Sequence, residues 1–335
     1  MISRHRGHDV TPTLGIGIIL WLAFVASAPP AQGRVSLEPL LAQAGLRGTT
    51  QVGPPPRGVF TNRWNRIVVE GNSRLASVNG IKVYLNDAVN WDGRGWTVAA
   101  ADWTEGVGFR WAARFPAPRR GPPVVLLDPG HGGVDKGAVS RRGVEEKRVT
   151  LDVARRVARR LESQGILVRL TRDRDVTLSL DARVEIAKRV SPDLFVSLHV
   201  NSAPSSPSVS GVETFVLTAP GYVSTAGGKS DATVYPGHRY GPLSVFLAHE
   251  IQRGMIRQAG VEDRGIKRAR FLLLKHVPAP AVLVEMGFLS HPREEAALIE
   301  RDHRDRLAEG IARGILSYLA AAGRPVVAMT SWSGR

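Results

Sequence analysis

The chain has 335 residues and no cysteine, which excludes disulfide bonds and thiolate ligands, so a metal site would have to use histidines and carboxylates. Hydrophobic residues make up 43% of it, as in a folded protein, and 45 Lys and Arg against 30 Asp and Glu give a net charge of +15, which suits an anionic partner. Because only 6% of the residues are aromatic and no nucleic-acid-binding motif is recognisable, we expect no nucleic-acid partner.

The N-terminus has the layout of a secretory signal. Arg4 and Arg6 precede the apolar run 14–28, which small residues and prolines follow. Pro29 directly after this run is unfavourable for cleavage at that point, so a retained anchor stays an alternative. We predict that residues 1–33 are a signal peptide or a membrane anchor and that the protein is exported to the periplasm or the cell envelope.

A linker and a small β-rich domain are predicted next. Residues 34–62 are rich in Pro, Gly and Gln, which predicts a linker. Residues 63–115 contain short β-type runs, and Asn79-Gly80 between alternating apolar residues is a strong hairpin signal. The string 78–86 resembles the N-terminal domain of copper amine oxidases. We interpret 63–115 as a scaffold or binding module.

Apolar strands then alternate with helical patterns over residues 122–323. This alternation predicts an α/β fold, a twisted, mostly parallel sheet flanked by helices. The expected strands begin at residue 124 and continue with 166–171, 193–200, 212–217 and 281–285, and the expected helices are 146–164, 181–190, 241–259 and 296–322. Residues 324–335 read as a loose tail.

The segment 218–241 lacks periodicity and is longer than most connections between elements. Its Gly, Ser, Thr, Tyr and Pro content is typical of a functional loop. We hypothesise that it gates the active site.

Three predicted strands end in a residue suited to metal binding or acid-base chemistry. His131 follows the first strand, His199 ends the strand 193–200 and Glu285 ends the strand 281–285. In a parallel sheet such residues converge at one end of the strands. Glu146 lies in the first turn of the helix after His131, and two imidazoles with one carboxylate form the ligand set of a catalytic zinc site.

Four motifs carry a specific resemblance. The runs 127–133, 143–147, 197–201 and 282–290 resemble, in this order, the zinc-dependent N-acetylmuramoyl-L-alanine amidases of the amidase-3 type. The resemblance implies that Zn²⁺ is the cofactor. The implied zinc ligands are His131, Glu146 and His199, and the implied catalytic carboxylate is Glu285.

Three further residues are weaker candidates. Asn201 and Arg270 are predicted to bind substrate, the latter through a peptide carboxylate, with turn capping and surface ion pairing as the respective alternatives. Asp128 is a support for the site, a substrate contact or a turn-capping residue.

The resemblance implies hydrolysis of the amide bond between N-acetylmuramic acid and L-alanine of peptidoglycan, in cell-wall remodelling or daughter-cell separation. Peptidoglycan is then the main partner, with an activator protein as a further one, and we expect a monomer. Two alternatives stay open: a non-catalytic peptidoglycan-binding wall protein, and a zinc peptidase acting on the stem peptide.

Overall fold

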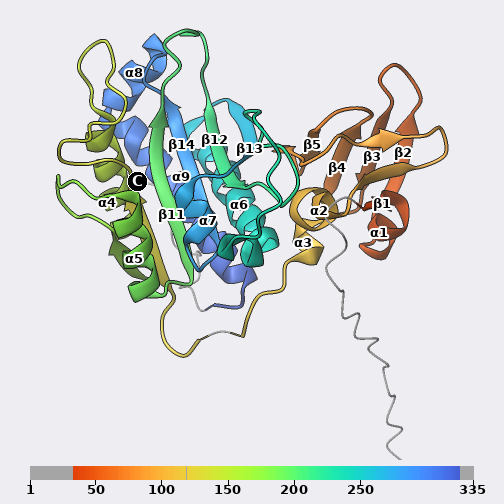
Figure 1. Ribbon diagram of the computed structural model, residues 1–335, viewed down its shortest axis with the longest axis horizontal. Helices are drawn as coiled ribbons and strands as arrows, with labels where there is room; N and C mark the ends of the chain where they lie inside the picture. The colour runs from red at the N-terminus through yellow and green to blue at the C-terminus, as the bar shows by residue number, and fades with distance from the viewer. Residues whose placement is uncertain (1–32, 118, 325–335) are drawn as a thin grey trace, which may run out of the picture.

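The computed structural model describes residues 33–117 and 119–324 (Figure 1). Nearly all of the predicted signal or anchor, and of the predicted tail, lies outside the described residues. Within the described ranges, no helix combines the length and the apolarity needed to span a bilayer.

The described chain has an N-terminal part, residues 33–117, and a C-terminal part, residues 119–324. An 11-stranded sheet runs through both parts, in the order β10-β9-β11-β14-β12-β13-β6-β5-β4-β3-β2. The first six are β10 (Leu167–Leu170), β9 (Val124–Pro129), β11 (Leu194–Asn201), β14 (Ala281–Phe288), β12 (Val212–Leu217) and β13 (Asp263–Ala269). The other five are β6 (Ile81–Tyr84), β5 (Leu75–Val78), β4 (Arg66–Glu70), β3 (Arg57–Thr61) and β2 (Arg47–Gln51). Figure 1 shows the sheet passing from β11 on the left to β2 on the right.

Neighbouring strands are parallel in one part of the sheet and antiparallel in another. β10, β9, β11 and β14 are parallel, whereas β12 runs antiparallel to β14 and β13 runs parallel to β12. The strands β2 to β6 form an antiparallel meander. The predicted α/β fold is therefore confirmed, with a sheet that is mixed overall and with β13 as a strand that sequence reasoning missed.

Helices cover both faces of the sheet in the C-terminal part. The core on one face contains residues of α4 (Glu146–Glu162), α6 (Gly241–Ala259) and α9 (Arg301–Ala321). The core on the other face contains residues of α5 (Leu180–Val190) and α7 (Leu272–His276). The predicted helix 296–322 is instead two helices, α8 (Pro292–Ile299) and α9, because the backbone is extended at Glu300 (ψ 129°).

Local sequence explains where α5 begins and where α6 ends. The hydroxyl of Ser179 accepts a hydrogen bond from the N–H of Ala182 at 3.1 Å and caps α5, as expected for serine at this position. Gly260 follows α6 with φ 64°, a left-handed conformation that glycine adopts without steric cost.

The linker prediction for residues 34–62 is wrong. These residues form β1 (Arg34–Ser36), α1 (Leu37–Gln43), β2 and β3, and the prolines lie in the loop 52–56 between β2 and β3. Leu37, Leu41 and Phe60 are buried in the core of the N-terminal part. Apolar residues that contact distant strands outweighed the local proline and glycine content.

The rest of the N-terminal part includes a second, separate sheet. This sheet has three strands in the order β1-β8-β7, where β7 is Asn90–Trp91 and β8 is Trp96–Ala99. Short helical turns follow: α2 (Ala100–Asp102), the π-helical η1 (Trp103–Val107) and α3 (Phe109–Ala112). The predicted hairpin is confirmed, since Asn79 (φ 52°) and Gly80 (φ 87°) connect β5 and β6.

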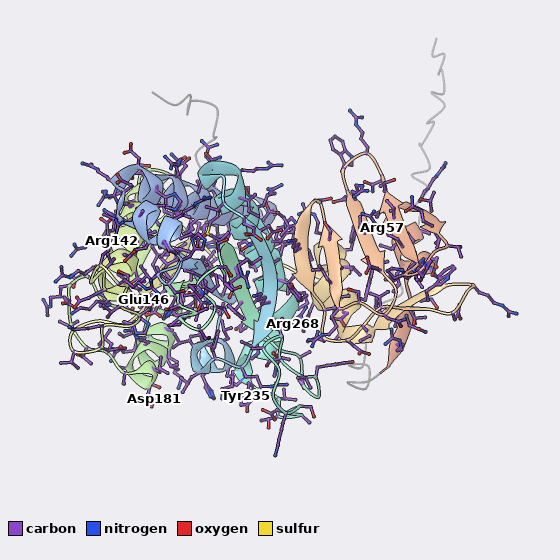
Figure 2. The ribbon with its side chains drawn as sticks, turned by 90° about the horizontal axis from the view of Figure 1, so that it is seen from above. Arg57, Arg142, Glu146, Asp181, Tyr235 and Arg268 are labelled. Carbon is purple, nitrogen blue, oxygen red and sulfur yellow. The ribbon has the colours of Figure 1, made fainter. Side chains whose placement is uncertain are left out.

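A buried arginine joins the two parts. Arg268 on β13 is fully buried and donates from Nε to the carbonyl oxygen of Tyr84 at 2.9 Å. Its guanidinium lies 4.0 Å from Asp102 and 3.7 Å from Glu105, both from the N-terminal part. Figure 2 shows Arg268 at this junction. The strands of the N-terminal part therefore continue the sheet of the C-terminal part, and direct contacts hold the two parts together.

The segment 218–241 lies away from the predicted metal-binding end of the sheet. β12 is antiparallel to β14, with Glu213 opposite Glu285 and Phe215 opposite Leu283. β12 therefore ends near the amino end of β14, and the segment starts there. Its residues are bound by Arg270, and by Arg74 of the N-terminal part, which donates to the carbonyl oxygen of Val223 at 3.0 Å. This position does not support the gating hypothesis.

Candidate metal centre and active site

The backbone turns sharply where β9 ends. His131 has φ 61°, a conformation that is uncommon for a residue with a side chain. Gly130 must lack a side chain, because a Cβ there would meet Cε1 of His199 at 2.4 Å. The turn thus brings the imidazole of His131 close to β11. Because the backbone conformation of His131 is uncommon, other residues have to stabilise this turn.

Two buried arginines hold this turn. Arg183 of α5 donates to the carbonyl oxygens of Pro129, at 2.9 Å, and His131, at 2.7 Å. Arg172 donates to the carbonyl oxygens of Pro129, at 2.9 Å, and Gly130, at 2.8 Å. Three consecutive carbonyl groups are therefore fixed by charged donors, which form stronger hydrogen bonds than neutral ones.

Asp128 anchors this support. Its buried carboxylate accepts hydrogen bonds from Arg183 at 2.6 Å, from Ser197 at 2.7 Å and from Thr171 at 2.5 Å. Of the roles left open by the sequence, support of the site is the one that these contacts favour. Sequence reasoning missed Arg172 and Arg183, and the one available signal was the position of Arg183 on the apolar face of a predicted helix.

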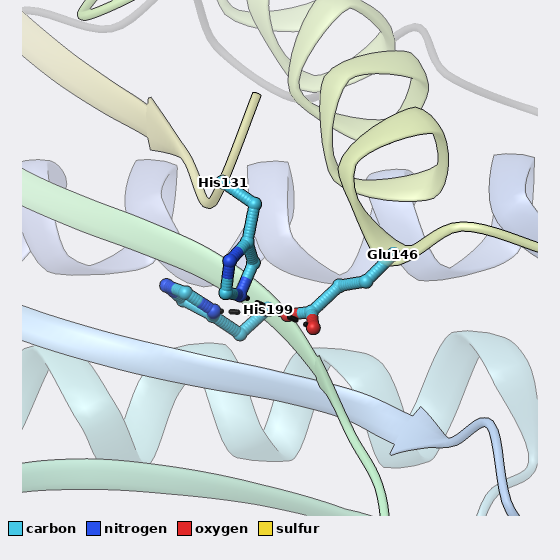
Figure 3. Close-up of side chains that lie close together, drawn as sticks. All are labelled: His131, Glu146 and His199. Atoms are coloured by element: carbon cyan, nitrogen blue, oxygen red, sulfur yellow. Dashed lines mark hydrogen bonds and ion pairs between the residues drawn. The ribbon is translucent and has the colours of Figure 1, made fainter. Parts of the chain in front are cut away.

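His131, Glu146 and His199 converge (Figure 3). Glu146 Oε2 lies 3.2 Å from His131 Nε2, and Glu146 Oε1 lies 2.9 Å from His199 Nδ1. The two imidazole rings are 5.0 Å apart and nearly perpendicular, at 81°. One ligand atom from each of the three residues lies within 4.8 Å of the others.

The donor set fits a zinc ion. Asp135 Oδ2 lies 2.9 Å from His131 Nδ1, so Nε2 is the nitrogen directed toward the centre. Histidine ligands of metals are commonly oriented by such a carboxylate. Glu146 is held in place by the N–H groups of Ala138, at 2.8 Å, and Val200, at 3.0 Å. Two imidazoles, one of them oriented by Asp135, and one fixed carboxylate would leave a fourth position for water.

The neighbouring charges shift the pKa values of Glu146 and His131. Burial by itself raises the pKa of Glu146, but hydrogen bonds from His131 and His199 outweigh it and lower this pKa well below its usual range. Burial lowers the pKa of His131, whereas Glu146 and Asp135 raise it, with a net increase. The carboxylate therefore stays ionised, as a metal ligand requires.

Glu285 lies beside this group on the next strand. It pairs in register with His199 on one side and with Glu213 on the other. Its buried Oε2 atom has no hydrogen-bond partner among the described residues. Burial, together with the charges of Glu146 and Glu213, raises the pKa of Glu285 well above its usual value, although Lys267 opposes the shift. A carboxyl group of this kind is suited to accept and release a proton.

The two predicted substrate-binding residues have protein partners. Asn201 donates from Nδ2 to Glu213 at 3.0 Å, so it supports that carboxylate. Arg270 donates to Ser224 at 3.2 Å and to the carbonyl oxygen of Tyr222, both in the segment 218–241. These contacts do not support substrate binding by Arg270, because its guanidinium is bound to a segment that starts at the other end of the strands.

The sequence of this half matches a known family. Residues 125–317 match the sequence profile of the N-acetylmuramoyl-L-alanine amidases. The chain belongs to this family. The predicted enzyme class is therefore confirmed.

Individual relatives agree with this assignment. The N-acetylmuramoyl-L-alanine amidase AmiA of Escherichia coli (strain K12) is 34% identical over 219 residues, which cover 58% of this chain and 75% of AmiA. LytC of Bacillus subtilis (strain 168) is 35% identical over 194 residues, or 58% of this chain and 35% of LytC.

A solved structure shows the same fold. The amidase AmiC2 of Nostoc punctiforme matches with a TM-score of 0.50 and 35% identity. The match covers 59% of this chain and 97% of the AmiC2 chain. The N-terminal part of this chain lies outside the matched family region.

Proposed function

We propose that this amidase hydrolyses the bond between N-acetylmuramic acid and L-alanine of peptidoglycan with a zinc ion bound by His131, Glu146 and His199. The observation that carries the proposal is the convergence of these three ligands next to Glu285. When bound, zinc supplies a water molecule with a pKa lowered to roughly 7 and polarises the amide carbonyl.

The residues of the chain perform the proton transfers. Glu285 accepts a proton from the attacking water through Oε2, which has no hydrogen-bond partner within residues 33–117 and 119–324. It returns this proton to the nitrogen of L-alanine, which leaves as an amine while the muramic lactyl group gains the water oxygen. Asp135 keeps Nε2 of His131 directed to the centre, and the turn held by Arg172 and Arg183 keeps the ring in place.

We further propose that the protein acts after export, in cell-wall remodelling or daughter-cell separation. The basic and apolar pattern of residues 1–33 supports export, and the net charge of +15 suits an anionic wall. A related amidase, CwlD of Clostridioides difficile, was solved in complex with the GerS lipoprotein (TM-score 0.51, 28% identity, covering 59% of this chain and 98% of its own). That complex supports an activator protein as a partner here.

The test is a product assay with metal analysis. Purified protein is incubated with sacculi, and the products are identified by mass spectrometry. We expect free stem peptides that begin with L-alanine, loss of activity with a chelator and recovery with zinc. Cleavage within the stem peptide would indicate a peptidase instead, and binding without any product or bound zinc would indicate a wall-binding protein.

A further inference from the structure

A buried carboxylate that the proposed reaction does not use lies next to Glu285. Glu213 on β12 is 3% exposed, and the ladder places it directly opposite Glu285. Since paired residues project to the same face of a sheet, His199, Glu285 and Glu213 form a row across three neighbouring strands.

Three donors bind Glu213. Its Oε1 accepts from Asn201 at 3.0 Å, and its Oε2 accepts from Arg264 Nε at 2.9 Å and from Lys267 Nζ. Two full positive charges thus face one carboxylate. Neither cation hydrogen-bonds to Glu285 among the described contacts, so Glu285 does not occupy their remaining donors.

Both cations keep donors that reach solvent. The side chain of Arg264 is 27% exposed and that of Lys267 is 15% exposed. Arg264 uses Nε for Glu213 and Nη1 for the carbonyl oxygen of Ser210 at 3.3 Å, while Nη2 has no partner in the part of the chain that the structure describes. Lys267 has one bond there, and an ammonium group carries three donors. A second anion would balance the charge of this pair.

The distance suits a peptide substrate. The backbones of Arg264 and Lys267 lie on β13, two strands from β14, and strands are about 4.8 Å apart. Because both cations reach back to Glu213 on β12, their charged groups lie between about 5 and 10 Å from Glu285. An extended peptide advances about 3.4 Å per residue, so this span equals about two to three residues. A carboxylate shortly after the L-alanine end can therefore reach the pair.

We propose that Lys267 and Arg264, held in place by Glu213, bind a free carboxylate of the stem peptide and select substrates that carry it. This inference rests on the proposed function and extends it to the peptide side of the substrate. Glu213 and Asn201 then act as positioning residues for the two cations.

The test compares two muropeptides that differ only in their stem carboxylates, one with free acids and one with carboxamides. For the wild-type enzyme we expect a KM at least about tenfold lower for the free acid. In K267M that difference should shrink severalfold through KM of the free-acid substrate. Because Lys267 also lowers the pKa of Glu285, kcat should change by the same factor for both substrates. K267R should restore the preference, and K188M, at an exposed lysine of α5, is the control.

The outcomes separate the two hypotheses. If the wild-type enzyme cleaves both substrates with equal KM, or if K267M leaves the ratio of the two KM values unchanged, this inference is overturned while the amidase function stands. If the wild-type enzyme cleaves neither substrate, the proposed function and this inference fall together. Should K267M not fold, calorimetric binding of the two free stem peptides to the wild-type protein decides, and equal affinity would overturn the inference.

Discussion

Glu285 on β14 lies opposite His199 on β11 in a parallel ladder. Adjacent strands fix the spacing of the proposed base and a proposed zinc ligand, so neither side chain depends on a mobile loop for its position. This arrangement separates metal binding from proton transfer, which makes the two roles distinguishable by mutation.

Replacement of Glu285 by glutamine should abolish turnover but not zinc binding. E285Q keeps the shape of the side chain and removes the proton acceptor, so we expect kcat to fall by about 10²- to 10⁴-fold. Zinc content and activity are measured on the same sample, with E185Q, at an exposed residue of α5, as the control. Full turnover in E285Q would show that another group is the base.

Replacement of a histidine ligand should remove zinc. H131A and H199A each leave two protein ligands, fewer than a catalytic zinc site uses, so we expect loss of bound zinc and of activity. Metal analysis after dialysis is the measurement. H276A serves as the control, because that histidine lies on α7 outside the metal group. Zinc retained in both ligand variants would contradict the assignment.

Replacement of Arg183 should weaken zinc binding from a distance. R183M removes the donors to Pro129 and His131, so the His131 turn loses part of its support. We expect zinc affinity to fall by about 10- to 100-fold, as for other outer-shell substitutions. Competition with a chromophoric chelator measures this, with R189M on an exposed position of the same helix as the control. Unchanged affinity in a folded R183M protein would show that the turn is stable without Arg183.

Glu105 should make the protein less stable as pH rises. Burial raises the pKa of Glu105 to about 7, although Arg268 opposes this and the charge of Asp102 adds to it. Between the usual pKa of 4.5 and about 7, the folded protein holds a proton that the unfolded chain has lost, so the free energy of unfolding falls with pH. The maximum loss is about 3 kcal/mol.

Urea unfolding at pH 5 and pH 8 tests this expectation. E105Q should equal the wild-type protein near pH 5 and exceed it at pH 8, because glutamine carries no charge to bury. If E105Q is instead less stable than wild type at pH 8, the ionised carboxylate stabilises the folded protein through Arg268, 3.7 Å away, and the expected rise in the pKa of Glu105 is wrong.

The sequence alone determined the chemical groups of the candidate site. Short motifs identify His131, Glu146, His199 and Glu285, because the chemistry needs these residue types at the ends of strands or at a helix start. Periodicity and turn residues also predicted α6, β12 and the Asn79-Gly80 hairpin, since hydrophobic spacing and positive φ are local properties.

Tertiary structure alone decided the partners of these groups. The strand β13, the fold of residues 34–62 and the place of the segment 218–241 depend on strand order and direction, which residues far apart in the chain determine. The same holds for Glu213, which the structure buries between Arg264 and Lys267. A charged residue looks solvated in sequence, and only the packing of distant strands shows which charges are buried together.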